Sequence, residues 1–578
     1  MAEQIISPGV FQNENVPVTL EAAAAPIGAA LITPSTKGPV GIPTTVTTYS
    51  DYKTKFGSTV VSGGAEYAYL GNISAQNYFK QGGSNLLVTR VVSASGFAAA
   101  SSSDIITGSG IGTGTNNVFT LKTISEGENQ NSTSTATAAG ALPLGTSDNL
   151  RFEISNVDSG SGIFTLTIRQ GNDRTADKTI LETFRGVSLD PKRDDYIAKV
   201  IGNQTFSVGT DGTDSFVEVD GEYPNKSKYV IVSAVNKPTP DYLDGAGAFK
   251  PAFTSSMPAN QEGTFASGVG SLFPSGDTVN WYKDISNTQT QGLSASDYSA
   301  TINLLKNKDQ YPFNVISTPG LVYENALHAT QLDKIITNTT SRGDSIFPID
   351  IVNHGSTVAN AVSTAGDLNT NYAAAYWPWL LVNEEDSSAN VWAPASTILP
   401  SVYVFNDNTS EAWFAPAGFT RGTMPNVVAP EKTLPRGLRD TLYNAKINPI
   451  ATFPGTGVVV YGQKTLQSLS TALDRVNVRR LLISLKGFIG NVSQNLVFEP
   501  NSLQTRNSFL SVVNPYLESV QQNQGLYAFK VVMDDSNNGP DVIDRQELRG
   551  AIYLQPVKTA EFIVLDFNLL PTGAEFPA

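Results

Sequence analysis

The order of elements near the end of the chain constrains its fold most strongly. Apolar residues that recur every three or four positions mark one face of a helix. Two such helices are predicted in succession, with Pro515 kinking or restarting the second and Gly525 ending it. Their apolar faces consist of Val478, Leu481, Leu482, Leu485 and Ile489, and of Phe509, Val513, Tyr516, Leu517 and Val520. Residues 526–533 and 548–554 have the composition of strands, so a helix pair followed by a sheet is expected.

Both chain ends carry short apolar segments. Residues 563–569 alternate between apolar and other side chains, with the exception of Val564, which indicates a half-buried strand. Residues 1–22 are too few to bury their own apolar side chains. The apolar residues of the two ends are Ile5, Ile6, Val10 and Phe11, and Ile563, Leu565, Phe567 and Leu569. A frayed terminus is one interpretation of the first segment. Linking arms are the other, because an unpaired strand edge is a template for another chain.

Strands and helices alternate through much of the remaining chain. The predicted strands lie at 29–33, 86–92, 229–233, 313–320 and 345–352, and the predicted helices at 47–57, 67–79, 296–306 and 326–337. Such alternation is typical of a partly parallel sheet. The composition changes between residues 96 and 235, where Ser, Thr, Ala and Gly are frequent and strands are predicted at 150–154 and 163–169. We therefore expect a mostly β insertion there, and we expect loops over 245–295.

Composition excludes several classes of function. The chain of 578 residues has 38 basic and 52 acidic side chains, a net charge of −14, and no basic patch. Nucleic-acid binders depend on cationic contacts with phosphates, so nucleic acid is not an expected partner. The chain has no cysteine, which excludes disulfides, thiolate metal sites and cysteine nucleophiles. The sequence shows neither a secretory signal nor an apolar run long enough to span a membrane, so a soluble chain made in a cytoplasm is expected.

Two segments come close to known binding loops but depart from them at essential positions. A P-loop needs Gly-Lys-Ser/Thr in succession, and here Gln463 separates Gly462 from Lys464. Residues 534–539 begin like a calcium loop, but position twelve is Arg545 instead of a bidentate glutamate. A polar turn is the simpler interpretation of the second segment.

No catalytic, metal or cofactor site is predicted. The two histidines, His328 and His354, have no ligand at metal-binding spacing. Three cations on the first C-terminal helix, Arg479, Arg480 and Lys486, are predicted to point away from its apolar face. They face a partner molecule in one interpretation. In the other, the two arginines pair within the chain with a carboxylate such as Glu499.

An ordered set of motifs resembles the contractile-tail sheath family of phages, whose relatives occur in contractile bacteriocins and type VI secretion systems. The motifs are Ala415-Pro-Ala-Gly418, Asn444-Ala-Lys-Ile-Asn448, Gly462-Gln-Lys-Thr-Leu466, Asn477-Val-Arg-Arg-Leu481, Phe498-Glu-Pro-Asn501 and Ala560-Glu-Phe-Ile563. One departure is Lys446, which stands before Ile447 where the family often has glycine.

The resemblance implies an α/β (α+β) multidomain fold with a mixed-sheet core and extended arms. The implied parts are an N-terminal linking arm (1–22), a discontinuous middle domain (23–95 and 236–429), an outward-facing β insertion (96–235), a C-terminal domain facing the tube (430–555) and a C-terminal strand and arm (556–578). The implied function is a structural sheath subunit that polymerises around a tail tube and contracts after a baseplate trigger.

The implied partners are further copies of the chain in stacked hexameric rings, the tail tube protein, and the baseplate and tail terminator proteins. The implied location is the tail of a virion assembled in the host cytoplasm. A bacteriocin or secretion-type sheath would use the same core, so it stays an alternative. An acidic β-rich adhesive protein and an enzyme housed in the insertion are two further alternatives, for which the sequence offers neither repeats nor a histidine cluster.

Overall fold

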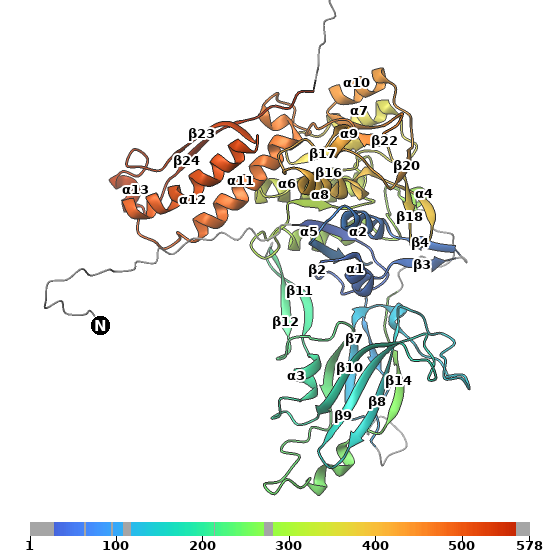
Figure 1. Cartoon of the computed structure of the whole chain (residues 1–578). Helices are drawn as coiled ribbons and strands as arrows, with labels where there is room; N and C mark the ends of the chain where they lie inside the picture. The colour runs from blue at the N-terminus through green and yellow to red at the C-terminus, as the bar shows by residue number, and fades with distance from the viewer. Residues whose placement is uncertain are drawn as a thin grey trace, which may run out of the picture. The chain divides into compact units, whose positions relative to one another are not determined.

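The structure is a computed structural model that describes residues 28–62, 65–93, 96–107, 117–212, 214–270 and 281–561 (Figure 1). The chain divides into two compact units, one spanning Pro26–Ile483 and the other beginning, in its described part, at Ser484. We call them the large unit and the C-terminal unit. No helix within the described ranges combines the length and the apolar character that crossing a membrane requires.

Two mixed sheets form the centre of the large unit. In spatial order, the first consists of β15 (Val315–Ser317), β1 (Ala29–Thr33), β5 (Leu86–Arg90) and β2 (Thr44–Val46), and the second of β16 (Phe347–Ile349), β17 (Ala373–Trp377), β21 (Ile447–Phe453) and β22 (Gly457–Val460). The first three strands of each sheet run parallel and the last is antiparallel. The predicted partly parallel sheet is thus confirmed. All five residues of β1 are buried, as expected for a strand covered on both faces.

Helices surround these sheets (Figure 1). They are α1 (Tyr49–Phe56), α2 (Leu70–Lys80), α5 (Ser299–Leu304), α6 (Ala326–Arg342), α7 (Val358–Gly366), α8 (Leu399–Thr409), α9 (Gly418–Arg421) and α10 (Arg436–Asn444). At the start of α1, Thr48 Oγ1 accepts a hydrogen bond from Asp51 N over 3.1 Å. The prediction that a helix begins at Tyr67 is wrong. Residues Ala65–Ala68 form β4, which pairs with β3 (Thr59–Ser62), and extended backbone at Tyr69 delays the helix to Leu70.

A small sheet and several short elements complete the central part of the large unit. The sheet consists of β19 (Ala389–Ala393), β18 (Leu380–Glu384) and β20 (Val427–Pro430), and the short elements include α4 (Trp281–Asp284) and the hairpin of β11 (Thr205–Asp211) and β12 (Asp214–Asp220). Helix α3 (Ile197–Ile201) belongs instead to the apolar core of the separate sheet described next. Two clusters of buried apolar side chains fill the space around the central sheets.

A seven-stranded antiparallel sheet with its own apolar core occupies the region of the predicted β insertion. In spatial order its strands are β10 (Ile180–Ser188), β9 (Ile163–Gln170), β8 (Leu150–Asp158), β14 (Gln261–Ala266), β6 (Ala99–Ser102), β7 (Phe119–Glu126) and β13 (Val230–Val235). Strand β14 lies in the segment predicted to be loop. It pairs with both β8 and β6, and a Cβ atom at Gly263 would lie 2.0 Å from the Phe152 ring. Close packing here requires glycine, which hides the strand from a composition-based prediction.

The C-terminal unit contains the predicted helix pair and two strands. Helix α11 (Val476–Gln494) leads into it, followed by α12 (Leu503–Gln522), β23 (Leu526–Val532), α13 (Pro540–Asp544) and β24 (Ala551–Pro556). Helix α12 continues through Pro515, so the predicted restart does not occur. Its buried face contains Phe509, Val513, Leu517 and Val520, as predicted. Tyr516 is instead partly exposed and stacks on Phe488, with 3.7 Å between ring centroids.

The backbone at Lys446 departs from ordinary geometry. Its φ of +65° lies in the left-handed region, which glycine adopts without strain and other residues rarely do. The residue lies two positions after the end of α10, and its N–H donates to Tyr443 O over 3.1 Å. This turn needs a left-handed residue, which is consistent with the glycine that the resembling family often has here.

Candidate assembly surfaces

The two arginines of α11 lie buried within the large unit. Arg479 stacks on Tyr372, with 4.1 Å from its guanidinium carbon to the ring centroid, and donates to Asn371 Oδ1 over 2.6 Å. Arg480 stacks on Tyr403 and donates to Asp407 Oδ1 over 2.7 Å. The expectation that these side chains point away from the buried face is therefore wrong. The structure favours the intramolecular alternative, with Asp407 in place of Glu499 as the carboxylate.

Burial explains why both arginines need these partners. The first ten residues of α11 are almost entirely covered, so a cation there loses its hydration and must be paired. Desolvation accordingly lowers the pKa of Arg479. Tyr403 is also buried, and its hydroxyl lies 2.7 Å from the Tyr376 hydroxyl, in an environment that raises its pKa to about 12. The third predicted cation, Lys486, is exposed in the C-terminal unit, where its role toward a partner stays a prediction.

The eight predicted arm residues lie outside the described residues. This applies to Ile5, Ile6, Val10 and Phe11 and to Ile563, Leu565, Phe567 and Leu569. The described neighbour of the C-terminal segment is β24, whose pairing with β23 forms a sheet of two strands. Strand addition at this sheet stays a prediction.

The residues of the P-loop-like segment are engaged in local structure. Lys464 donates its ammonium to Tyr443 O over 2.8 Å and lies above the Tyr443 ring, and its N–H donates to Asn448 Oδ1 over 2.6 Å. Gln463 is buried. Residues 534–537 form a turn in which Asp534 Oδ1 accepts hydrogen bonds from the Ser536 hydroxyl and, over 2.9 Å, from Ser536 N, and these two hydrogen bonds lower the pKa of Asp534. Within the described ranges, no group of three or more His, Cys, Asp or Glu residues could hold a metal ion.

The two histidines occupy different environments. His328 is fully buried, accepts a hydrogen bond from Val322 N on Nδ1 over 3.2 Å, and has a pKa that desolvation lowers to about 4. His354 lies among aromatic rings, 4.7 Å from Tyr282 and 5.0 Å from Trp392 between centroids. Both arrangements suit a neutral imidazole held for packing.

A buried carboxyl group in the large unit escaped prediction. Asp350 follows β16, and its side chain accepts hydrogen bonds from the backbone N–H of Ser396, over 3.0 Å, and from the Ser396 hydroxyl. No described cation forms an ion pair with it. Desolvation raises the pKa of Asp350 to about 7, so the carboxyl changes its charge near neutrality. Its burial depends on strands far apart in the sequence, and no local pattern signals it.

The C-terminal unit exposes several large apolar side chains. Phe498 is fully exposed and has a φ of +74°, which is unusual for a bulky residue.

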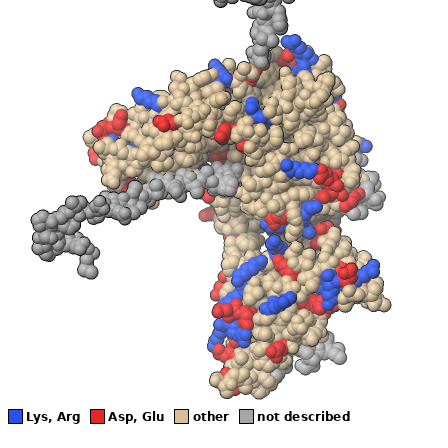
Figure 2. Space-filling view, in the orientation of Figure 1, with Lys and Arg blue, Asp and Glu red and all other residues tan. Residues whose placement is uncertain are grey.

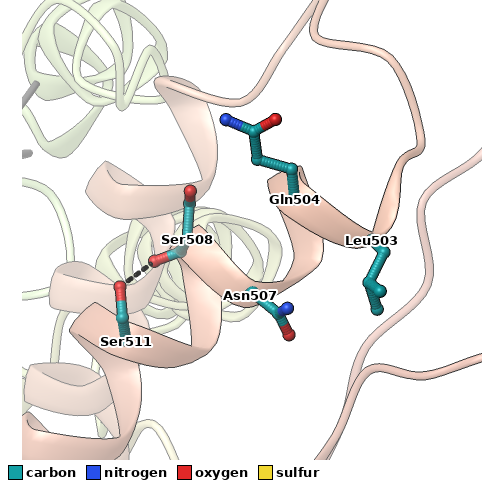
Figure 3. A pocket seen from close by; sticks show the side chains of 5 residues that line it. All are labelled: Leu503, Gln504, Asn507, Ser508 and Ser511. Atoms are coloured by element: carbon teal, nitrogen blue, oxygen red, sulfur yellow. Dashed lines mark hydrogen bonds between the residues drawn. The ribbon is translucent and has the colours of Figure 1, made fainter. Parts of the chain in front are cut away.

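A shallow hollow of about 570 Å³ lies along α12, and Figure 3 shows the five side chains of that helix that line it. They are Leu503, Gln504, Asn507, Ser508 and Ser511, none of which is charged. Exposed apolar groups of this kind are typical of surfaces that a partner covers.

Acidic and basic side chains are interspersed on the face of the molecule that Figure 2 shows. No single large basic area appears on that face, in keeping with the net charge of −14. The net negative charge therefore makes copies of the chain repel one another, and contacts between copies need locally complementary charges.

Comparison with known proteins defines the class of the C-terminal part. Residues 469–569 match the phage tail sheath C-terminal domain. The matched segment contains α11, α12, β23, α13 and β24, which include the helix pair and strands described above. The resemblance predicted from the sequence motifs is confirmed.

Individual relatives are tail sheath proteins of phages. The chain is 38% identical over 210 residues to the tail sheath protein of Vibrio phage KVP40. The aligned segment covers 36% of this chain and 31% of the relative. It is 34% identical over 227 residues to the tail sheath protein of Enterobacteria phage T4, covering 39% of this chain and 34% of the relative. The matches thus span about one third of the length of these relatives.

A solved structure supports the fold over nearly the whole chain. The crystal structure of a sheath tail protein from Listeria innocua aligns with a TM-score of 0.53 at 9% sequence identity and covers 93% of this chain and 96% of that one. The predicted multidomain α/β (α+β) class is confirmed.

Proposed function

We propose that this chain is the subunit of a contractile tail sheath. It polymerises around a tail tube in an extended metastable state and contracts to drive the tube through the envelope of a target cell. The observation that carries the proposal is the match of residues 469–569 to the phage tail sheath C-terminal domain. The proposed partners are further copies in stacked rings, the tube protein, and baseplate and terminator proteins. The proposed location is the virion tail, after assembly in the host cytoplasm.

The linkage between subunits is proposed to complete the C-terminal sheet. Among the described residues, β23 and β24 form a sheet of only two strands, and such a pair is marginally stable without further strands or a covering helix. Helix α12 covers part of it, and an arm strand from a neighbour would extend it. Each added backbone hydrogen bond contributes roughly 0.5–1.5 kcal/mol. Residues 1–22 and 556–578 are the proposed arms, joined to a core of 23–95, 236–429 and 430–555, from which β14 contributes a strand to the sheet of the insertion.

The proposed role is structural and not enzymatic. Energy would be stored during assembly and released when contraction replaces one set of interfaces with a better-fitting set. Such a mechanism needs no nucleotide, and the engagement of Lys464 with Tyr443 agrees with that. The C-terminal domain is proposed to face the tube and the seven-stranded sheet to face outward.

A sheath of a bacteriocin or secretion-type machine is the second candidate. It would use the same C-terminal domain, so the fold does not distinguish it. The seven-stranded sheet and the names of the curated relatives favour a phage.

Electron microscopy of purified protein tests the proposal. The full chain is expected to form long hollow cylinders in negative stain, and variants that lack residues 1–20 or 562–578 are expected to remain as single subunits. A third variant, with Leu144→Ser on the exposed surface of the insertion, is the control and should assemble like the full chain. Single subunits in every preparation would contradict the proposed function. Cylinders in every preparation would contradict the linking role of the arms alone.

A further inference from the structure

Three aromatic side chains gather on the surface of the large unit. Phe419 on α9, Phe453 at the end of β21 and Tyr461 after β22 have ring centroids 5.0 to 6.0 Å apart. Phe419 is 51% exposed and Tyr461 is 44% exposed. Strand β21 contacts α10 and pairs with β22, which in turn contacts α9. Because each ring comes from a different part of the chain, the fold itself assembles this cluster.

An arginine lies across the aromatic cluster. The guanidinium carbon of Arg439 is 4.9 Å from the Phe453 centroid and 5.3 Å from the Tyr461 centroid. Its side chain has no ion pair or hydrogen bond with any described residue, and the same holds for exposed Arg436 three positions earlier on α10. Asp440 on that helix pairs with neither. We call these five residues, Phe419, Phe453, Tyr461, Arg436 and Arg439, the aromatic–arginine platform.

The platform has the composition of an interaction hot spot. Aromatic residues and arginine dominate the binding energy of protein interfaces. Stacking holds the Arg439 guanidinium in place while its N–H donors stay available, so a carboxylate could bind it with little loss of side-chain entropy. A partner with carboxylates at matching spacing is therefore expected.

Helix α13 of the C-terminal unit carries two aspartates three positions apart, which is the spacing of Arg436 and Arg439 on α10. Along α10 the charges are Arg436, Arg439 and Asp440, and along α13 and the residue that caps its C-terminus they are Asp541, Asp544 and Arg545. One helix thus has the inverse charge pattern of the other. Residues three apart lie about 5–6 Å apart on a helix surface, so parallel packing would place Asp541 opposite Arg436 and Asp544 opposite Arg439.

The two aspartates are available for such a contact. Asp541 and Asp544 are exposed, and neither side chain has an ion pair or hydrogen bond with a residue in the described part of the chain. Arg545 is directed to Glu547, with 3.5 Å between the charged atoms. Figure 2 shows acidic side chains gathered at the end of the C-terminal unit that carries α13.

We propose that the aromatic–arginine platform binds helix α13 of a second copy of this chain. The inference rests on the proposed function, since it assigns one contact of the sheath polymer. On a chain with net charge −14, contacts between copies must overcome repulsion, and a cationic platform that meets an acidic helix does so locally.

Charge reversal and its compensation test this contact. The double variant Arg436→Glu with Arg439→Glu is compared with the double variant Asp541→Arg with Asp544→Arg, with the combination of all four, and with the wild type. The control matched to the platform variant is Lys226→Glu with Lys228→Glu, two exposed lysines whose reversal changes the net charge by the same amount as reversing the two arginines. Sedimentation and negative-stain microscopy measure the assembled fraction. Circular dichroism and thermal unfolding check that each variant is folded.

We expect each platform or α13 double variant to lower the assembled fraction at least about tenfold, because like charges across an interface repel. The variant with all four substitutions should recover assembly, and the control should match the wild type. Assembly by either double variant at the wild-type level would overturn the inference and leave the proposed function intact. A loss of assembly that is not restored when all four substitutions are combined would also overturn the inference. If the wild type and the control both fail to assemble, the proposed function fails and the inference falls with it.

Discussion

The large unit and the C-terminal unit differ in the kinds of side chain that they bury and expose. In the large unit, even charged groups are buried with partners: Arg169 and Asp173 are fully covered and bond each other over 2.7 Å. In the C-terminal unit, apolar groups such as Phe498, Leu503 and Tyr527 are exposed. The large unit thus combines buried, paired charges with local exposed patches such as Phe419 and Tyr461. The C-terminal unit leaves apolar groups uncovered on α12, on β23 and between its helices.

The largest expected effect is in the large unit. Asp173→Ala would leave Arg169 and Arg151 without their shared buried carboxylate, and breaking a buried ion pair costs about 3–5 kcal/mol. Urea unfolding followed by fluorescence should show this loss. Lys192→Ala is the control, because its pair with Asp241 is exposed and its removal should change little. A loss similar to that of the control would mean that the buried charges do not stabilise this unit.

A pair of truncations in the C-terminal unit measures the contrast directly. Leu517→Ala on the buried face of α12 should lower the free energy of unfolding by about 2–4 kcal/mol. Phe498→Ala should change it by less than about 0.5 kcal/mol, because the ring is fully exposed. Thermal unfolding of the unassembled subunit checks both. A large loss with Phe498→Ala would show that the ring packs within the subunit and would remove the contrast.

The buried carboxyl of Asp350 should make the large unit more stable in mild acid. Its pKa of about 7 in the folded state exceeds the ordinary value of 3.8, so the folded state binds an extra proton between these values. Stability is then expected to fall as pH rises from 4 to 7 and to level off above 7. Between pH 5 and 8 this amounts to roughly 2–3 kcal/mol. Unfolding of Asp350→Asn measured at both pH values should lack this component; an unchanged pH dependence would contradict the assignment.

The smallest expected effect concerns the turn after α10. Lys446→Gly should raise the free energy of unfolding by about 0.5–1 kcal/mol, because glycine adopts a φ of +65° without steric strain. Lys446→Ala keeps the strain and should give no gain, which makes it the control. Chemical denaturation resolves this difference. If both variants behave alike, the contact of the lysine ammonium with Ser468 Oγ, 3.0 Å away, outweighs the strain.

Local sequence pattern predicted the elements whose burial is uniform. Strand β1 begins and ends as predicted because all five of its residues are apolar or small and buried. The buried face of α12 was predicted from spacing alone. Local pattern did not predict β14, because close packing at Gly263 requires a glycine that is atypical of strands. It also did not predict the burial of Arg479 and Arg480, because their partners lie far away in the sequence.

The surface features were beyond local pattern for a similar reason. Phe419, Phe453 and Tyr461 are separated by stretches of other structure, and only the fold brings their rings within 5.0 to 6.0 Å. The family resemblance identified the class of the C-terminal domain, but it gave no indication of this cluster or of the unpaired arginines beside it.

The two-stranded sheet of the C-terminal unit also bears on how a cell could handle this protein before assembly. If neighbouring strands complete the sheet, the last step of folding becomes a second-order reaction whose extent depends on subunit concentration. A dilute subunit would then be more sensitive to proteases at β23 and β24 than a concentrated one. Nucleation at a defined starting point would decide where polymer growth begins, and would keep the open strand edges from joining at random.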